Sequence, residues 1–107
     1  MSLDVTLTKV MPTQVYDANI THNLGKMAAA AGIYEALWRP EEIGVTKAEQ
    51  LIPLLREGLE KLKAAPAHYE QFNAANGWGL YEHFVPFVEN YLSACIEHPD
   101  AEVSVSR

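Results

Sequence analysis

The most regular pattern of apolar and polar positions lies between residues 80 and 96. Apolar side chains recur there at steps of three and four, the spacing of one helix face: Leu80, Phe84, Phe87, Val88, Tyr91, Leu92, Cys95 and Ile96. Solvated types such as Glu82, Glu89 and Glu97 occupy the opposite face. The pattern predicts an amphipathic helix that forms the main wall of the core, with a kink at Pro86, which cannot donate a backbone hydrogen bond.

Two helices are predicted in the first half of the chain. Capping types precede the first, and any of Asp17, Asn19 or Thr21 suits its N-cap. This helix runs through His22 to about Ala31, and helical character resumes from residue 33 until Arg39-Pro40 ends the segment. Residues 41–45 are predicted to form a loop.

A third helix is predicted to begin at a capping box, with Thr46 at the cap and Glu49 three residues on. Its apolar side chains are Leu51, Ile52, Leu54, Leu55, Leu59 and Leu62. Pro53 lies inside it, and we expect a kink there too. Pro66 suits the start of a short helix over residues 67–72, which is followed by a turn.

Strand-like alternation lies at both ends of the chain. Residues 3–10 alternate around Leu3, Val5 and Leu7 until Met11-Pro12-Thr13 ends the run, and residues 102–106 alternate again. Residues 15 and 16 are predicted to form a second, very short strand. We therefore predict one domain over residues 1–107 with an α+β, mostly helical fold: three to four helices and a short terminal β-ribbon formed by the N- and C-terminal strands.

Charge and cysteine content restrict the partners and the compartment. Eight Lys and Arg against fourteen Asp and Glu give a net charge of −6 without a basic cluster, so we expect no nucleic-acid partner. No apolar run approaches the roughly 18 residues that span a bilayer, so we expect no membrane association. The single cysteine, Cys95, cannot form an internal disulfide, which favours the cytoplasm.

No motif indicates catalysis. The chain lacks a glycine-rich phosphate loop, paired cysteines, HExxH and GxSxG, so we predict no cofactor and assign no catalytic residue. Four histidines are the possible metal ligands: His22, His68, His83 and His98. No two of them are three or four residues apart on one helix, so only tertiary structure can bring them together, and the sequence names no metal.

Two polar segments are the candidates for a ligand site. Thr21-His22-Asn23 opens a helix, where free backbone N–H groups can hold an anion. In the alternative explanation Thr21 only caps the helix, and Asn23 makes a buried hydrogen bond to a neighbouring loop. The turn Asn76-Gly77-Trp78-Gly79 precedes the last helix, and we expect Trp78 to pack over its first turn. The predicted ligand-binding residues are His22, Asn23, Asn76, Trp78 and His83.

Aromatic and amide side chains are further candidates for a binding site. The two tryptophans, Trp38 and Trp78, lie beside residues that interrupt regular secondary structure. We expect both to be partly exposed. An apolar pocket with a few polar groups is typical of a small-ligand site, while exposed tryptophan equally suits a protein–protein contact.

Three segments resemble a family of small bacterial and phage proteins of uncharacterised function: residues 19–24 (NITHNL), 36–40 (ALWRP) and 76–81 (NGWGLY). The resemblance covers the chain from about Tyr16 to the C-terminus. It implies a compact stand-alone domain and a setting on a mobile genetic element, and it transfers no catalytic residue.

Two functional hypotheses follow. The first is a non-enzymatic protein-interaction module that binds a protein partner or forms a homo-oligomer. The second is a small-ligand- or metal-binding protein, conceivably an enzyme, with its site near the Thr21-His22-Asn23 helix start and the residue 76–79 turn. The sequence favours the first, because nothing in it demands chemistry. The second gains if His22, Asn23, Trp78 and His83 line one cleft.

Overall fold

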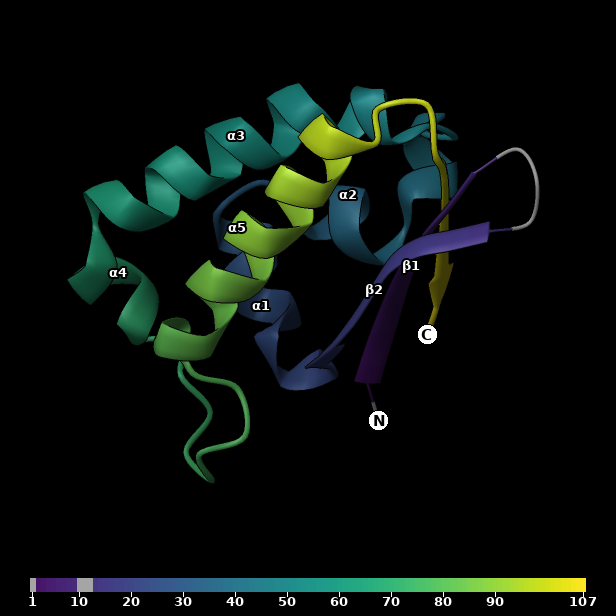
Figure 1. The fold of residues 1–107 in the computed structure, drawn as a ribbon. Helices are drawn as coiled ribbons and strands as arrows, with labels where there is room; N and C mark the ends of the chain where they lie inside the picture. The colour runs from purple at the N-terminus through teal and green to yellow at the C-terminus, as the bar shows by residue number, and fades with distance from the viewer. Residues whose placement is uncertain (1, 10–12) are drawn as a thin grey trace.

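The computed structural model describes residues 2–9 and 13–107, apart from the side chain of Thr13, and has the predicted α+β, mostly helical fold (Figure 1). The elements in chain order are β1 (Ser2–Lys9), β2 (Thr13–Thr21), the 3-10 helix η1 (His22–Leu24), α1 (Gly25–Ala30), α2 (Tyr34–Trp38), the 3-10 helix η2 (Pro40–Ile43), α3 (Ala48–Ala64), α4 (Pro66–Glu70), α5 (Tyr81–Glu97) and β3 (Glu102–Ser106). The predicted end of the first strand, at Val10 to Pro12, lies outside the described residues.

The two terminal strands pair as predicted, and a third strand joins them. The sheet order is β2-β1-β3 with both pairs antiparallel, and the register places Val5 opposite Val105 and Leu3 opposite Ile20. The second strand is nine residues long, so the prediction of a two-residue strand was wrong. Its polar residues resemble helix caps in sequence, but its inward positions pair with the buried face of β1.

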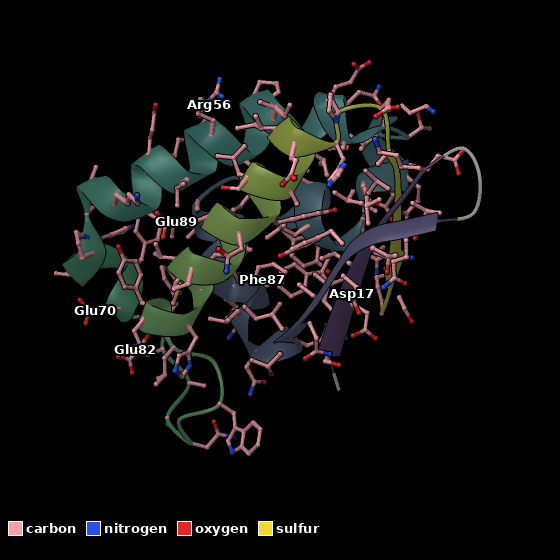
Figure 2. The ribbon with its side chains drawn as sticks, in the orientation of Figure 1. Asp17, Arg56, Glu70, Glu82, Phe87 and Glu89 are labelled. Atoms are coloured by element: carbon pink, nitrogen blue, oxygen red, sulfur yellow. The ribbon has the colours of Figure 1, made fainter. Side chains whose placement is uncertain are left out.

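The five labelled helices, α1 to α5, lie on one side of the sheet in Figure 1. Leu3, Val5 and Leu7 face the helices with no exposed surface, whereas Asp4 between them is exposed on the other face. Figure 2 shows Arg56 of α3 and Glu82 of α5 pointing outward from the helical layer. The sheet therefore has one buried apolar face and one open polar face.

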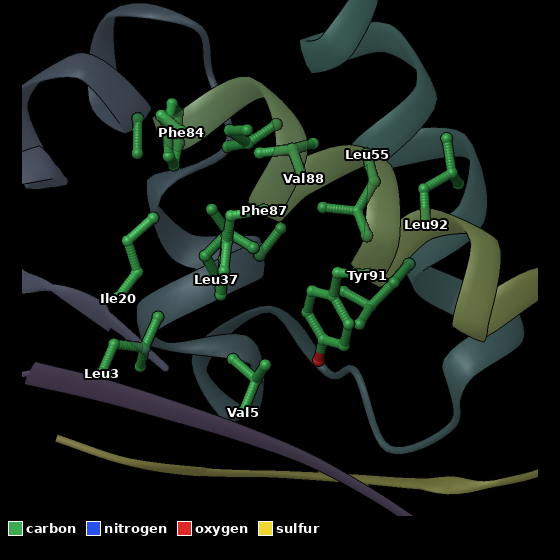
Figure 3. Packing of buried hydrophobic residues seen from close by; sticks show 14 of the residues in the cluster. Leu3, Val5, Ile20, Leu37, Leu55, Phe84, Phe87, Val88, Tyr91 and Leu92 are labelled. Atoms are coloured by element: carbon green, nitrogen blue, oxygen red, sulfur yellow. The ribbon is translucent and has the colours of Figure 1, made fainter. Parts of the chain in front are cut away.

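α5 forms the predicted wall of the core. Phe84, Val88, Tyr91 and Cys95 are fully buried in it, and Figure 3 shows several of its side chains between α3 and the sheet. Ile96 is 50% exposed, so its assignment to the buried stripe was wrong. A helix turns about 100° per residue, which carries Ile96 away from the core-facing Cys95. Leu54 of α3 is exposed for the same reason, beside the buried Leu55.

The start of α3 differs from the predicted capping box. The helix begins at Ala48, and Gln50 rather than Glu49 caps it: its Oε1 accepts from the backbone nitrogens of Thr46 and Lys47 at 2.7 and 2.9 Å. The next two backbone N–H groups donate to the carbonyls of Ala101 and Pro99, 2.9 Å away in each case. Backbone carbonyls of the connection to β3 thus satisfy the first helical N–H groups, which the side chain of the N-cap residue Lys47 does not. The preceding segment is also not a simple loop, because residues 40–43 form η2.

Replacing Tyr91 by phenylalanine is expected to stabilise the protein by about 1 kcal/mol, because no partner among the described residues bonds its buried hydroxyl. Figure 3 shows that hydroxyl pointing toward the strands, and burial raises the pKa of Tyr91 far above its usual value. The ring itself stacks on Tyr16 at 5.9 Å and remains in the variant. Urea unfolding measures the change, with Tyr16→Phe, at a half-buried position, as the control. A destabilised Tyr91→Phe variant means that the hydroxyl is bonded in solution.

Candidate functional site

The corner between β2 and η1 holds the first group of candidate residues. Thr21 is the N-cap of η1, as one of the three predicted alternatives, and its Oγ1 accepts from the backbone nitrogen of Asn23 at 3.3 Å. His22 is half-buried and Asn23 is exposed. The chain leaves the sheet here and enters the helical layer, so this corner presents polar side chains next to the start of the core.

The loop between α4 and α5 carries the second group and projects from the helical layer in Figure 1. Asn73 Oδ1 accepts from Tyr81 N at 2.7 Å, and Ala74 N donates to Gly79 O at 2.9 Å, which closes the base of the loop. At its tip, Asn76 Oδ1 accepts from Trp78 N at 3.0 Å. Gly77 and Gly79 have φ values of 80° and 126°. The predicted Asn-Gly-Trp-Gly turn is therefore confirmed.

A hydrogen bond joins the corner to the loop. Asn23 Nδ2 donates to the backbone carbonyl of Trp78 at 2.6 Å. Gly79 also lies against Asn23, since a Cβ on Gly79 would come within 2.9 Å of the Asn23 Cβ. The predicted alternative was that Thr21 caps the helix and that Asn23 bonds a neighbouring loop. The structure has both of these hydrogen bonds, but Asn23 is exposed rather than buried. Asn23 holds the loop in place.

His22 is oriented by a buried tryptophan. The indole nitrogen of Trp38 donates to His22 Nδ1 at 2.7 Å. Trp38 is only 2% exposed, so the expectation that it is partly exposed was wrong; its ring stacks on Tyr34 at 5.4 Å inside the core. An Nδ1 that accepts carries no proton, so neutral His22 has its proton on Nε2.

The corner and the loop border an open cleft of about 1000 Å³. We call it the Asn23–Trp78 cleft, and its lining comprises Ser2, Asn19, Ile20, Thr21, His22, Asn23, Leu24, Asn76, Gly77, Trp78, Gly79 and His83. All five predicted ligand-binding residues are among them. A second hollow of about 720 Å³ adjoins it, shares His22, Asn23 and Asn76, and includes Lys26.

The two remaining predicted residues, Trp78 and His83, are both exposed. Trp78 is 71% exposed, so the expectation that it packs over the first turn of α5 was wrong; its exposure was predicted correctly. The loop places the indole at the rim of the cleft instead. His83, in the first turn of α5, is exposed, and neither ring nitrogen bonds a described residue.

The four histidines do not form a metal site within residues 2–9 and 13–107, where no group of three or more His, Cys, Asp or Glu side chains could hold an ion. His68 packs edge-on against Tyr69 at 4.9 Å, and His98 follows the end of α5. Only His22 and His83 line the same cleft.

Cys95 lies apart from the cleft, in the core. It is fully buried, and burial raises the pKa of its thiol to about 12. A thiol that stays protonated and buried is a poor nucleophile, which agrees with leaving Cys95 out of the candidate residues.

Sequence reasoning missed Asn19 in the lining of the cleft and Trp38 behind it. Trp38 acts from the core through its bond to His22, and no local signal reveals such a contact. Asn19 was read only as a possible helix cap, although its amide donates to Ser2 Oγ and Asp4 Oδ1 across the sheet at 2.9 and 2.7 Å. The predicted second strand covered only residues 15 and 16, so Asn19 was not recognised as an outward-facing residue of β2.

Among the described residues no helix has the length and apolar character required to cross a membrane. Comparisons of the chain with protein-family models, with curated proteins and with solved structures find no match.

Proposed function

We propose that the protein is a non-enzymatic binding protein that takes a small polar ligand in the Asn23–Trp78 cleft. The observation that carries the proposal is that His22, Asn23, Asn76, Trp78 and His83, chosen from two distant segments, line one cleft. A concave surface with convergent polar groups is the usual form of a small-ligand site. Neither His22 nor His83 bonds a hydroxyl or thiol among the described residues, so the proposal assigns binding and no reaction.

A protein-interaction module is the second candidate function, and the exposure of Trp78 favours it. An indole exposed by 71% on a projecting loop suits the anchor of a protein contact or of a homo-oligomer interface. The net charge of −6 supports a partner other than nucleic acid. For either function we propose the cytoplasm as the compartment, since the single cysteine is a buried free thiol.

A thermal-melt screen of the full chain against small polar metabolites tests the first function. A ligand present at about a hundredfold its dissociation constant adds roughly 2.7 kcal/mol of stability. For a domain of this size each kcal/mol raises Tm by about 4–8 °C. We expect Trp78→Ala and His83→Ala to abolish the shift with little effect on the unliganded Tm, because both side chains are exposed.

The control is Ile43→Ala, which removes an exposed apolar side chain that does not line the cleft and must leave the shift unchanged. If no metabolite raises Tm, and the mass in solution rises with concentration in the wild type but not in Trp78→Ala, the interaction module replaces the ligand site.

A further inference from the structure

The Asn23–Trp78 cleft has no formal charge in its lining. Among the described residues that line it there is no Asp, Glu, Lys or Arg. A charged ligand would lose water there without gaining an ion pair from a lining residue, which costs free energy. Asp4 lies outside the lining, and its carboxylate already bonds Asn19 at 2.7 Å. The chemistry of the cleft therefore favours an uncharged ligand.

Hydrogen-bond donors remain free around the cleft. Asn76 uses its Oδ1 for the backbone of Trp78, so its amide nitrogen keeps two donors. The bond from Trp38 leaves Nε2 of neutral His22 as a donor. The hydroxyl of Thr21 accepts from Asn23 N and donates to no described residue, so its proton is also available.

The lining also offers acceptors. Asn19 donates through its amide nitrogen to Ser2 and Asp4, and its Oδ1 remains an acceptor. Neutral His83 offers one acceptor and one donor nitrogen, and no described residue uses either. The lining of this uncharged cleft thus offers both donors and acceptors, which matches hydroxyl groups, each of which donates and accepts.

Trp78 adds an apolar platform at the rim. Its indole is 71% exposed, and the bond from Asn23 to its carbonyl fixes the loop that carries it. A flat aromatic face buries C–H surface at low conformational cost. The ring of a sugar presents C–H groups on one face and hydroxyls at its edge, so it can contact the indole and the polar groups together.

We propose that the ligand of the Asn23–Trp78 cleft is a neutral carbohydrate, an inference that rests on the ligand-binding function proposed above. The hollow that shares His22, Asn23 and Asn76 with the cleft gives a sugar chain room to continue past the first ring. Its lining adds amides and only one charged side chain, that of Lys26.

Titration of the ¹⁵N-labelled full chain tests the inference. The probes are short neutral oligosaccharides of glucose, mannose, galactose and N-acetylglucosamine, with AMP, citrate and spermidine as charged probes. The two tryptophans give two indole N–H signals, one from exposed Trp78 and one from Trp38, which reports on His22. We expect at least one neutral oligosaccharide to shift the Trp78 signal saturably and the charged probes to leave it unchanged.

Calorimetry on variants then locates the contact. Trp78→Ala is expected to weaken binding of that oligosaccharide about tenfold or more, as truncation of an aromatic anchor usually does. Asn76→Asp keeps the oxygen that accepts from Trp78 but replaces the amide donors by a charge, and it should weaken binding while leaving Tm unchanged. Ile43→Ala, outside the cleft, must retain wild-type affinity.

The outcomes separate the two proposals. A saturable shift only with a charged probe overturns the carbohydrate assignment and leaves the ligand site standing. The absence of a saturable shift with every probe overturns the carbohydrate assignment and also counts against the proposed function.

Discussion

Replacing Gly58 by alanine is expected to destabilise the protein by about 1–3 kcal/mol, although alanine is the better helix former. Gly58 is buried within α3, and a Cβ there would lie 2.3 Å from Ile33 Cγ2 and 3.1 Å from Ile33 Cδ1. Ile33 is buried and β-branched, so it cannot turn away cheaply. The gain in helix propensity, at most about 1 kcal/mol, is smaller than the cost of overpacking.

A double-mutant cycle shows whether Ile33 is the cause. Ile33→Ala alone leaves a cavity and should cost about 2–5 kcal/mol. In the double variant the new methyl of residue 58 enters that space. The stability loss of the double variant should therefore be smaller than the sum of the two single-variant losses, by about 0.5–3 kcal/mol. Urea unfolding of the four proteins gives the values. Strict additivity would mean that the crowding at Gly58 has another source.

Gly58 illustrates what the sequence cannot predict. In α3 it lies among leucines whose spacing already accounts for the buried face, so nothing in the pattern requires a glycine. The requirement comes from Ile33, which is distant in sequence and precedes α2. Only tertiary structure brings the two together.

The elements that sequence did predict are those whose pattern is local and long. α5 repeats its apolar spacing over several turns, and β1 and β3 alternate with the period of a half-buried strand. β2 was underestimated because its outward residues, Asp17, Asn19 and Thr21, are also the types that cap helices. Their pairing with β1 makes this segment a strand rather than the start of a helix, and strand pairing is not a local property of the sequence.

The candidate site was predictable in its members but not in their contacts. Chemical type singled out Trp78 and His22, but the turn signal predicted that Trp78 packs over the first turn of α5, whereas the residue is 71% exposed. The buried partner of His22, Trp38, was expected near the surface because it precedes a chain break at Arg39-Pro40. A helix-ending proline marks where the helix stops and does not determine which way the last helical side chain points.

Replacing Gly79 by alanine is expected to weaken ligand binding more than tenfold and to destabilise the loop by about 1–3 kcal/mol. Gly79 has a φ of 126°, which side-chain-bearing residues rarely adopt, and its Cβ would meet the Asn23 Cβ at 2.9 Å. To relieve the backbone strain and the close contact with Asn23, the loop must move away from the β2–η1 corner. The bond from Asn23 to Trp78 O, 2.6 Å long, then breaks and the cleft opens.

Gly77 is the matched control in the same loop. Its φ of 80° also favours glycine, but a Cβ there meets no atom within 4 Å. Gly77→Ala should therefore cost only the backbone term, about 1–2 kcal/mol, and keep Asn23 bound to the loop. Melting temperature and the Asn23 side-chain amide signal distinguish the two variants without knowledge of the ligand.

Local opening of the loop limits the stability loss that Gly79→Ala can show, so Tm alone does not distinguish Gly79→Ala from Gly77→Ala. If the loop detaches at less cost than the strain, Tm falls only by the cost of detachment, whereas the Asn23 amide signal changes fully. We therefore expect the two glycine variants to differ more in that signal and in ligand affinity than in Tm. Equal behaviour of both variants would mean that contact between Gly79 and Asn23 does not hold the loop, and the Asn23–Trp78 cleft would then lack a fixed wall.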